Sequence, residues 1–478
     1  MRTGVRRASL IGLLIAAVGM VTSAPAAPAD PGTDHPAMAN DGTRANEPAI
    51  AVNPRDPRMV ITAANSSGTG TFGAFDAQMN GYYSLDGGKT FASGGGMPKA
   101  DGARYLSDPH LDYDSRGRAY SAYLTYNPTM TSAVGGVAVA VDQTGGRRWP
   151  DARMTLVERN RGFDEDGECK FQDFPALAVD RGRGAGGRPR DIVYVAWQQP
   201  TFDGDSCSNF VGTYLRFARS TDGGRTFSRP MALGDPDDGI GYVPTLAVAP
   251  DGTVYVTHLQ YPAAESCPGG GYAVDVVVEV SRDGGRTFTS NVADLACFGM
   301  ALPGLGLVGF NSTTGAMYRL HPAPNLSVDP RSGALVLVYG HLGADKLQDV
   351  RVLTSRDRGT TWRVGGSITS ELGAEQHFPR IATAPNGREI VLFYATLPGG
   401  GLIASSAVSA DDGKTWSMPT ALATLPSNGH DALYTGKFIG DYIGIAVGRD
   451  GVAHPVWTDL REVRGLSTQA IWTREVSP

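Results

Sequence analysis

Four carboxylates stand at comparable places in the chain, each just before or inside a short apolar segment. They are Glu47, Asp108, Asp173 and Asp441. Paired carboxylates suit the hydrolysis of glycosidic bonds, in which one protonates the leaving oxygen while the other attacks or activates water. These four are therefore candidates for a catalytic acid and base. The alternative for each one taken singly is that it caps a strand or faces water.

A second group of polar side chains occupies similar positions and could bind a substrate. His377 and Arg380 lie at the start of one apolar segment, and Asp459 and Arg461 follow another. We take all four as candidates for substrate binding. Asp459 and Arg461 could instead form a surface ion pair of little energetic weight.

The sequence gives little support to metal chemistry. Its eight histidines show no His-Glu-x-x-His spacing, and Cys-x-x-Cys is absent. The acidic run from Asp164 to Glu168 could hold Ca²⁺, but it does not match an EF-hand loop, and a solvated loop is the simpler interpretation. We expect no metal and no cofactor.

The elements that must position these residues recur along the chain. Six segments begin with proline and alternate apolar and other residues, which predicts a strand in each. They start at Pro48, Pro109, Pro175, Pro244, Pro324 and Pro379. An Asp-Gly or Asn-Gly turn and a second apolar strand follow in the clearest cases, as in Asp251-Gly252 before Val254. A seventh unit, from Asp441 to Val447, lacks the proline but still reads as strand, turn and strand.

A second motif, Ser-x-Asp-x-Gly-x-Thr-Phe/Trp, follows five of these units. Its aspartates are Asp86, Asp222, Asp283, Asp357 and Asp411, and a degenerate sixth copy runs from Asp142 to Trp149. The aspartate accepts hydrogen bonds from nearby backbone N–H groups, the glycine permits a positive φ, and the aromatic ring packs inward. The motif therefore predicts a turn that closes a β-hairpin, and we assign its aspartates a structural role.

Repetition of these units in fixed order predicts an all-β chain folded as a β-propeller. The spacing fits four-stranded blades with the aspartate turn between the third and fourth strands, and we favour seven blades over six. A β-sandwich or a parallel β-helix would not explain the fixed order. We expect the last blade to borrow a strand from the other terminus, with residues 471–474 contributing to that closure.

The five full turns resemble the Asp-box, or BNR, repeats of the sialidase superfamily, and the resemblance covers essentially the whole mature chain. It implies a propeller similar to that of secreted bacterial exo-α-sialidases, with the substrate on the face opposite the Asp boxes. Sialidases open their first blade with a Phe/Tyr-Arg-Ile-Pro motif, whereas this chain has Ala45-Asn46-Glu47-Pro48. The bidentate guanidinium anchor for an anionic sugar is thus missing at that position. Tyr434 and Tyr442 could supply a tyrosine nucleophile of sialidase type, and packing is the alternative role.

The four cysteines provide a check on orientation. In the predicted propeller, Cys169, Cys207, Cys267 and Cys297 all fall in loops of one face. An even number of cysteines in an exported chain predicts disulfides. Of three possible pairings we expect Cys169 with Cys207 and Cys267 with Cys297, because those loops are neighbours.

The amino terminus reads as a secretory signal. Arg2, Arg6 and Arg7 precede an apolar stretch from Ala8 to Val21 and a small-residue cleavage pattern. We expect residues 1–29 to be a signal peptide, 30–45 a linker and 46–478 a single propeller domain, in a secreted protein without a membrane anchor after cleavage. The net charge of −6 gives no cationic excess for nucleic acid.

Two functional hypotheses follow. The first is an extracellular glycoside hydrolase of exo-α-sialidase type, acting on a glycan or glycoconjugate. The alternative is a non-catalytic propeller that binds a glycan or a protein, which the missing arginine motif favours. We expect a monomer in either case.

Overall fold

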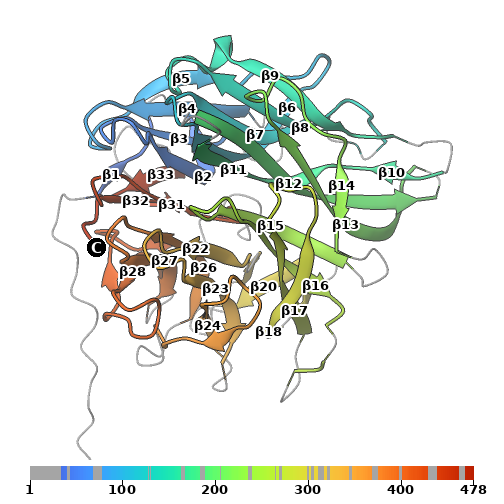
Figure 1. Cartoon of the computed structure of the whole chain (residues 1–478). Helices are drawn as coiled ribbons and strands as arrows, with labels where there is room; N and C mark the ends of the chain where they lie inside the picture. Colours follow the sequence, from blue (N-terminus) through green and yellow to red (C-terminus); the bar gives the residue numbers. More distant parts are fainter. Residues whose placement is uncertain are drawn as a thin grey trace, which may run out of the picture.

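The computed structural model shows a β-propeller of seven blades, which confirms the predicted fold class and the preferred blade number (Figure 1). It describes residues 34–39, 43–67, 78–127, 129, 131–162, 167–183, 189–204, 206–234, 240–263, 265–267, 272–298, 301–302, 306–310, 317–319, 323–343, 347–368, 375–397, 401–428, 439–461 and 469–478. The predicted signal peptide, Tyr434 and most of the acidic run before Cys169 lie outside these residues. No helix among the described residues is long and apolar enough to cross a membrane.

Each of the first six blades is an antiparallel sheet whose four main strands follow chain order from the centre outward. Blade 1 contains β2 (Arg44–Val52), β3 (Val60–Ser67), β4 (Gln78–Ser84) and β5 (Ala92–Gly96). Blade 2 contains β6 (Tyr105–Tyr113), β7 (Ala119–Tyr126), β8 (Gly135–Asp142) and β9 (Arg153–Arg159). Blade 3 contains β11 (Asp173–Arg183), β12 (Pro189–Asp203), β13 (Asn209–Ser220) and β14 (Met231–Leu233), with β10 (Cys169–Lys170) beside β12.

The remaining blades repeat this arrangement. Blade 4 contains β15 (Ile240–Val248), β16 (Val254–Tyr261), β17 (Tyr272–Ser281) and β18 (Thr289–Phe298). Blade 5 contains β22 (Asn325–Val328), β23 (Leu335–Leu342), β24 (Gln348–Ser355) and β25 (Arg363–Val364). Blade 6 contains β26 (Gln376–Thr383), β27 (Glu389–Thr396), β28 (Gly401–Ser409) and β29 (Thr420–Ala421), with β30 (Ser427–Asn428) also on β28. A small sheet of β19 (Ala301–Leu302), β20 (Gly306–Phe310) and β21 (Met317–Arg319) lies between blades 4 and 5 in the sequence.

Blade 7 joins the two ends of the chain. It contains β31 (Gly444–Val447), β32 (Ala453–Asp459) and β33 (Ala470–Thr473), and its outer strand is β1 (His35–Pro36). His35 pairs with Thr473 and Pro36 with Trp472, so the expected borrowing of a strand is confirmed. Figure 1 shows β1 beside β33 in this blade. The propeller thus takes in residues of the segment that we expected to be a linker.

The seven inner strands form a closed ring. β2 contacts β6, and contacts continue through β11, β15, β22 and β26 to β31, which contacts β2 again. Apolar side chains fill the spaces between neighbouring blades, as where Tyr120 and Val139 of blade 2 pack with Val195 and Trp197 of blade 3. Because each sheet buries both faces against its neighbours, closure of the ring is what completes the core.

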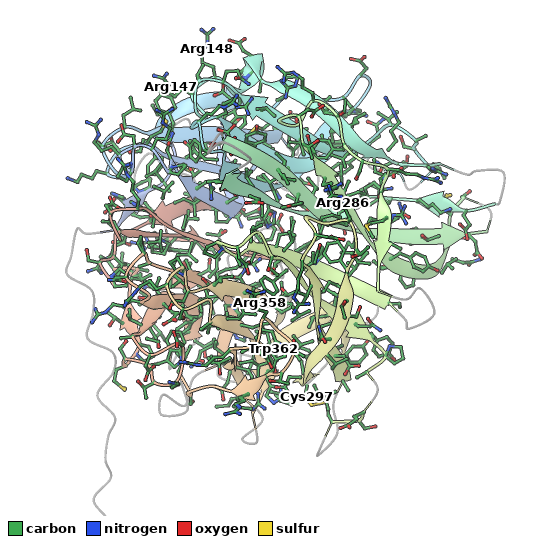
Figure 2. The ribbon with its side chains drawn as sticks, viewed as in Figure 1. Arg147, Arg148, Arg286, Cys297, Arg358 and Trp362 are labelled. Atoms are coloured by element: carbon green, nitrogen blue, oxygen red, sulfur yellow. A yellow bond between two sulfur atoms is a disulfide. The ribbon has the colours of Figure 1, made fainter. Side chains whose placement is uncertain are left out.

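The aspartate turns lie between the third and fourth strands, as predicted. In blade 4, Asp283 Oδ1 accepts hydrogen bonds from the backbone N–H groups of Arg286 (2.8 Å) and Thr287 (3.0 Å), while Thr287 Oγ1 donates to Oδ2 (2.7 Å). Each ring packs on a core cluster, as Phe288 does. Figure 2 labels Arg147, Arg286 and Arg358, which belong to the turns of blades 2, 4 and 5 and follow one another down the view in that order.

Both predicted disulfides are present. Cys169 is bonded to Cys207 and Cys267 to Cys297, with a Cα–Cα distance of 5.8 Å in each pair. All four cysteines lie where strands begin or end on the side of the blades opposite the aspartate turns. The disulfides therefore fasten loops at the face that carries the candidate site.

Candidate functional site

The first strand of five blades contains a bulge at a residue followed by proline. The register shifts there in β2, β6, β11, β15 and β26. The residues before proline have positive φ, namely Glu47 (54°), Asp108 (60°), Phe174 (50°), Val243 (50°) and Phe378 (55°). Our expectation that these strands start at proline is therefore wrong, because each strand begins two to four residues earlier and continues through the bulge.

This backbone conformation is strained. Its repetition points to a role at the central channel, which is the space enclosed by the ring of seven inner strands. Positive φ is rare for residues with a Cβ, and proline further restricts the residue that precedes it. Bulges re-aim side chains and are enriched beside functional sites. In blades 1 and 2 the re-aimed residue is one of the candidate catalytic carboxylates, Glu47 or Asp108.

Asn65, near the end of β3, connects these two carboxylates across the boundary between blades 1 and 2. Its Nδ2 donates a short 2.5 Å hydrogen bond to Glu47 Oε2, and its Oδ1 accepts from the backbone N–H of Asp108 at 2.8 Å. Glu47 Oε1 also accepts from the backbone N–H of Asp441 at 2.9 Å. The Glu47 carboxylate is thus linked through Asn65 to the backbone of Asp108 and directly to the backbone of Asp441.

Gln198 repeats this arrangement between blades 3 and 4. Its Nε2 donates to Asp173 Oδ2 at 2.8 Å, and its Oε1 accepts from the backbone N–H of Val243 at 2.9 Å. In both cases an amide of the second strand, which pairs with the residue just before the bulge, holds a carboxylate in its own blade and the bulge of the next blade. Amides suit this role because they offer a donor and an acceptor at once.

All four candidate carboxylates converge on two tyrosines. The pKa of Tyr126, at the end of β7, is raised by burial and then by the charges of Asp108, Asp173 and Glu47. The pKa of Tyr442 is raised well above its usual value by burial and then by Asp108, Glu47 and Asp441. These carboxylates come from blades 1, 2, 3 and 7.

Tyr442 lies across the channel. Its buried ring meets Phe174 of blade 3 edge-on at 5.6 Å between centroids, and its hydroxyl donates to the carbonyl of Pro109 in blade 2 at 3.4 Å. The guanidinium of Arg380, from blade 6, lies 5.8 Å from the ring centroid. Because burial and the carboxylates keep the phenol protonated, it is suited to donate a hydrogen bond rather than to act as a phenolate.

Arg380 brings a buried positive charge to the same centre. Its Nε donates to the carbonyl of Ile443 at 3.0 Å, while its buried Nη1 has no hydrogen-bond partner among the described residues. Burial lowers the pKa of Arg380 to about 10, which leaves it charged. His110 lies close by, and its pKa falls to about 3 through burial and then through the charge of Arg380, so His110 is neutral.

The other three candidates for substrate binding lie elsewhere. His377, just before the bulge of β26, is buried in the blade opposite Tyr394, and burial lowers its pKa to about 3. Arg461 Nη2 lies 2.6 Å from carboxylate oxygens of both Asp459 and Asp34, and its guanidinium stacks 4.1 Å from the Trp472 ring centroid. Asp459 and Arg461 are therefore a buried network at the junction of the chain ends, and not an exposed ion pair.

Asn65, Tyr126 and Gly440 belong to the site although we did not single them out from the sequence. Asn65 and Gln198 both pair with the residue just before the bulge of the first strand, so an alignment of the second strands would have indicated Asn65. Tyr126 lies two residues beyond the equivalent position and pairs with Tyr105. Gly440 has φ +95°, and a Cβ there would lie 3.0 Å from Glu47 Cγ. The spacing of residues in the sequence does not indicate this contact between Gly440 and Glu47. No group of three or more metal-ligating side chains occurs in the described part of the chain.

Comparison with known proteins assigns no family. No model of a known protein family matches the sequence, and no curated protein matches it. A Hadza microbial sialidase, Hz136, is 16% identical, with 84% of this chain and 73% of that chain covered and a TM-score of 0.46. The GH93 α-L-arabinofuranosidase of Fusarium graminearum is 13% identical, with 79% and 96% covered and a TM-score of 0.48. The intramolecular trans-sialidase from Ruminococcus gnavus is 14% identical, with 91% and 94% covered and a TM-score of 0.42. The chain is similar to these enzymes, and at such identities and TM-scores the similarity fixes neither a family nor an activity.

Proposed function

We propose that this chain is a secreted, sialidase-like propeller that acts as an exo-acting glycoside hydrolase on extracellular glycans. The observation that carries the proposal is the hydrogen-bonded grouping of Glu47 with Asp108, through Asn65, and with the backbone of Asp441, while Asp173 lies next to Phe174, whose ring meets Tyr442. Export is supported by the two disulfides, which form in oxidising compartments.

In this proposal the four carboxylates have different tasks. Glu47 is held in place by Asn65 and by the backbone of Asp441. Asp108 and Asp173 are half-buried and can reach a ligand at the channel mouth. Arg380 Nη1, which has no partner among the described residues, can donate a hydrogen bond to a sugar hydroxyl or to the oxygen of the leaving group.

The alternative is a propeller that binds a glycan or a protein without hydrolysing it. Among the described contacts, Arg380 is the arginine whose guanidinium lies at Tyr442. A single guanidinium forms fewer hydrogen bonds to the carboxylate of an anionic sugar than three convergent arginines would. This observation favours neutral sugars, or binding alone, over sialic acid. The choice between hydrolysis and binding is open to a direct assay.

Turnover of fluorogenic glycosides tests the proposal. Purified protein is assayed with 4-methylumbelliferyl glycosides, including the α-sialoside and the α-L-arabinofuranoside. We expect Asp108→Asn and Asp173→Asn each to lower kcat by about 100-fold or more, as loss of an acid or base does. Asp151→Asn is the matched control, because Asp151 is exposed beside Arg148 and lies outside the carboxylate cluster.

Two results would reject the hydrolase proposal. One is absence of turnover on every glycoside of the panel. The other is turnover that both cluster variants leave unchanged. Binding of a glycan array by a protein without turnover would then support the alternative.

A further inference from the structure

A cavity of about 930 Å³ opens on the outer wall of the propeller, between blades 2 and 3. Its floor and sides come from β9 and the residues after it, from β13, and from the segment before β14. The cavity shares no lining residue with the carboxylate cluster. Its volume lies in the range of ligand pockets in proteins.

Four arginines line this cavity, which we call the basic groove. They are Arg159, Arg161, Arg216 and Arg229, and the acidic residues among the lining are Glu158 and Asp101. The described residues that line the groove therefore carry a net positive charge in a protein whose overall net charge is −6. Such a local excess, opposite in sign to the whole chain, attracts anions.

Arg216 is the deepest of the four and lacks full hydrogen bonding. Its Nη2 donates a long 3.4 Å hydrogen bond to the carbonyl of Pro230, and its buried Nε has no partner among the described residues. Burial lowers the pKa of Arg216, and the positive charges of Arg161 and Arg229 also lower it. The negative charge of Glu158 acts in the opposite direction and raises this pKa. A buried guanidinium N–H without a partner, beside two like charges, is unfavourable unless an anion completes the site.

The other residues that line the groove restrict the class of ligand that it can bind. Its apolar members are aliphatic, including Met154, Leu156 and Val157, and no aromatic ring is found among the described residues that line the groove. Neutral sugars and nucleic-acid bases bind largely by stacking on aromatic rings, so neither is favoured. Guanidinium groups instead match planar or tetrahedral oxyanions through paired hydrogen bonds.

We propose that the basic groove binds the carboxylate or sulfate groups of an acidic polysaccharide. Arg216 contacts an oxyanion from the floor of the groove, and the exposed Arg159, Arg161 and Arg229 contact the chain at the rim. The site is separate from the carboxylate cluster, so the proposal holds whether or not the protein hydrolyses a glycan.

Isothermal titration with size-defined polymers tests this inference. Heparin fragments supply sulfate groups, oligogalacturonate supplies carboxylates alone, and dextran is the neutral comparison. We expect binding to the heparin fragments, to the oligogalacturonate or to both, weakening as salt is raised, and no binding to dextran. The polymer that binds shows whether the groove recognises sulfate or carboxylate groups.

Arginine variants connect the binding to the groove. We expect the double variant Arg161→Gln/Arg229→Gln, whose changed side chains are both exposed, to weaken binding about tenfold or more, and Arg216→Gln to do the same. Arg363→Gln is the matched control, because Arg363 is an exposed arginine of blade 5 outside the groove. The Asp108→Asn variant should bind as the wild type does.

Three results would overturn the inference. They are no binding of either acidic polymer, binding that survives in the double variant, and an equal loss in Arg363→Gln, which would indicate attraction by general charge. A melting curve of Arg216→Gln shows whether that variant folds. If it does not, the exposed double variant alone decides.

Discussion

At the residue scale, the candidate site depends on side chains held by a strained backbone. Glu47 and Asp108 have positive φ before proline, and Asn65 fixes both through its amide. Strain of this kind persists only where the surroundings enforce it. The surroundings here include the amide of Asn65, the backbone of Asp441 and the close approach of Gly440 to Glu47.

Gly440→Ala tests this positioning. A Cβ at residue 440 would lie 3.0 Å from Glu47 Cγ and 3.1 Å from the Glu47 backbone nitrogen, so Glu47 must move. We expect kcat on any glycoside that the wild type hydrolyses to fall about tenfold or more, while the protein stays folded.

Gly451→Ala is the control for backbone strain. Gly451 lies in the same blade with φ +82°, and a Cβ there would meet no atom within 4 Å. Both variants should lose about 1–2 kcal/mol of stability from an alanine at positive φ. Equal activity in the two variants would contradict a positioning role for Gly440.

At the element scale, the aspartate turns fasten each blade to the one before it. The carbonyl of Gly223 in the blade 3 turn accepts from Arg153 Nη2 of blade 2 at 2.7 Å, and that of Gly284 in the blade 4 turn accepts from Arg219 Nη1 of blade 3 at 2.8 Å. The degenerate turn of blade 2 keeps the geometry, because Asp142 Oδ2 accepts from the backbone N–H of Gly146 at 2.7 Å, as serine does in the other turns. The turns thus set the packing between blades.

Acid should weaken these turns. Burial acts to raise the pKa of Asp222, but hydrogen bonds from Thr226, Ser220 and the Arg225 backbone outweigh it and lower the pKa from 3.8 to about 2. A lowered folded-state pKa stabilises the fold above pH 3.8, and that stabilisation is lost as the pH falls through about 2. We expect the melting temperature to fall steeply over this range.

Asp222→Ala should lower stability at pH 7 by about 1–2 kcal/mol, because it removes the acceptor of several hydrogen bonds. It should also flatten the pH dependence between pH 4 and pH 2. Asp151→Asn serves again as the control, since Asp151 is exposed and lies outside the turn hydrogen bonds. A pH profile identical to that of the wild type would contradict the assigned role of Asp222.

At the scale of the whole molecule, stability depends on closing the ring. Blade 7 is completed by β1, and Asp34 just before it reaches Arg461, whose guanidinium also meets Asp459 and Trp472. The Asp34 side chain is 1% exposed and that of Arg461 is 5% exposed, so this ion pair is shielded from solvent. Removing one partner of a shielded pair leaves a buried charge less well compensated.

Asp34→Ala should destabilise the propeller by about 2–3 kcal/mol. This is at the low end of the cost of breaking a buried ion pair, because Arg461 keeps its contact with Asp459. Asp56→Ala removes the exposed partner of Arg58 and should cost less than about 1 kcal/mol. Thermal unfolding of both variants measures the difference. Similar melting temperatures would mean that the terminal strand does not hold the ring closed.

The sequence alone determined the repeat, the aspartate turns, the seven blades, the cysteine pairing and the face on which the carboxylates gather. Each of these follows from local patterns, since alternation, turn residues and fixed order act within one blade. Only the tertiary structure decided that Asn65 links Glu47 to Asp108, that Tyr442 crosses the channel, that Arg461 joins the chain ends and that the basic groove lies between blades 2 and 3. These contacts join residues of different blades, and their geometry depends on how the ring closes, which no local pattern in the chain encodes.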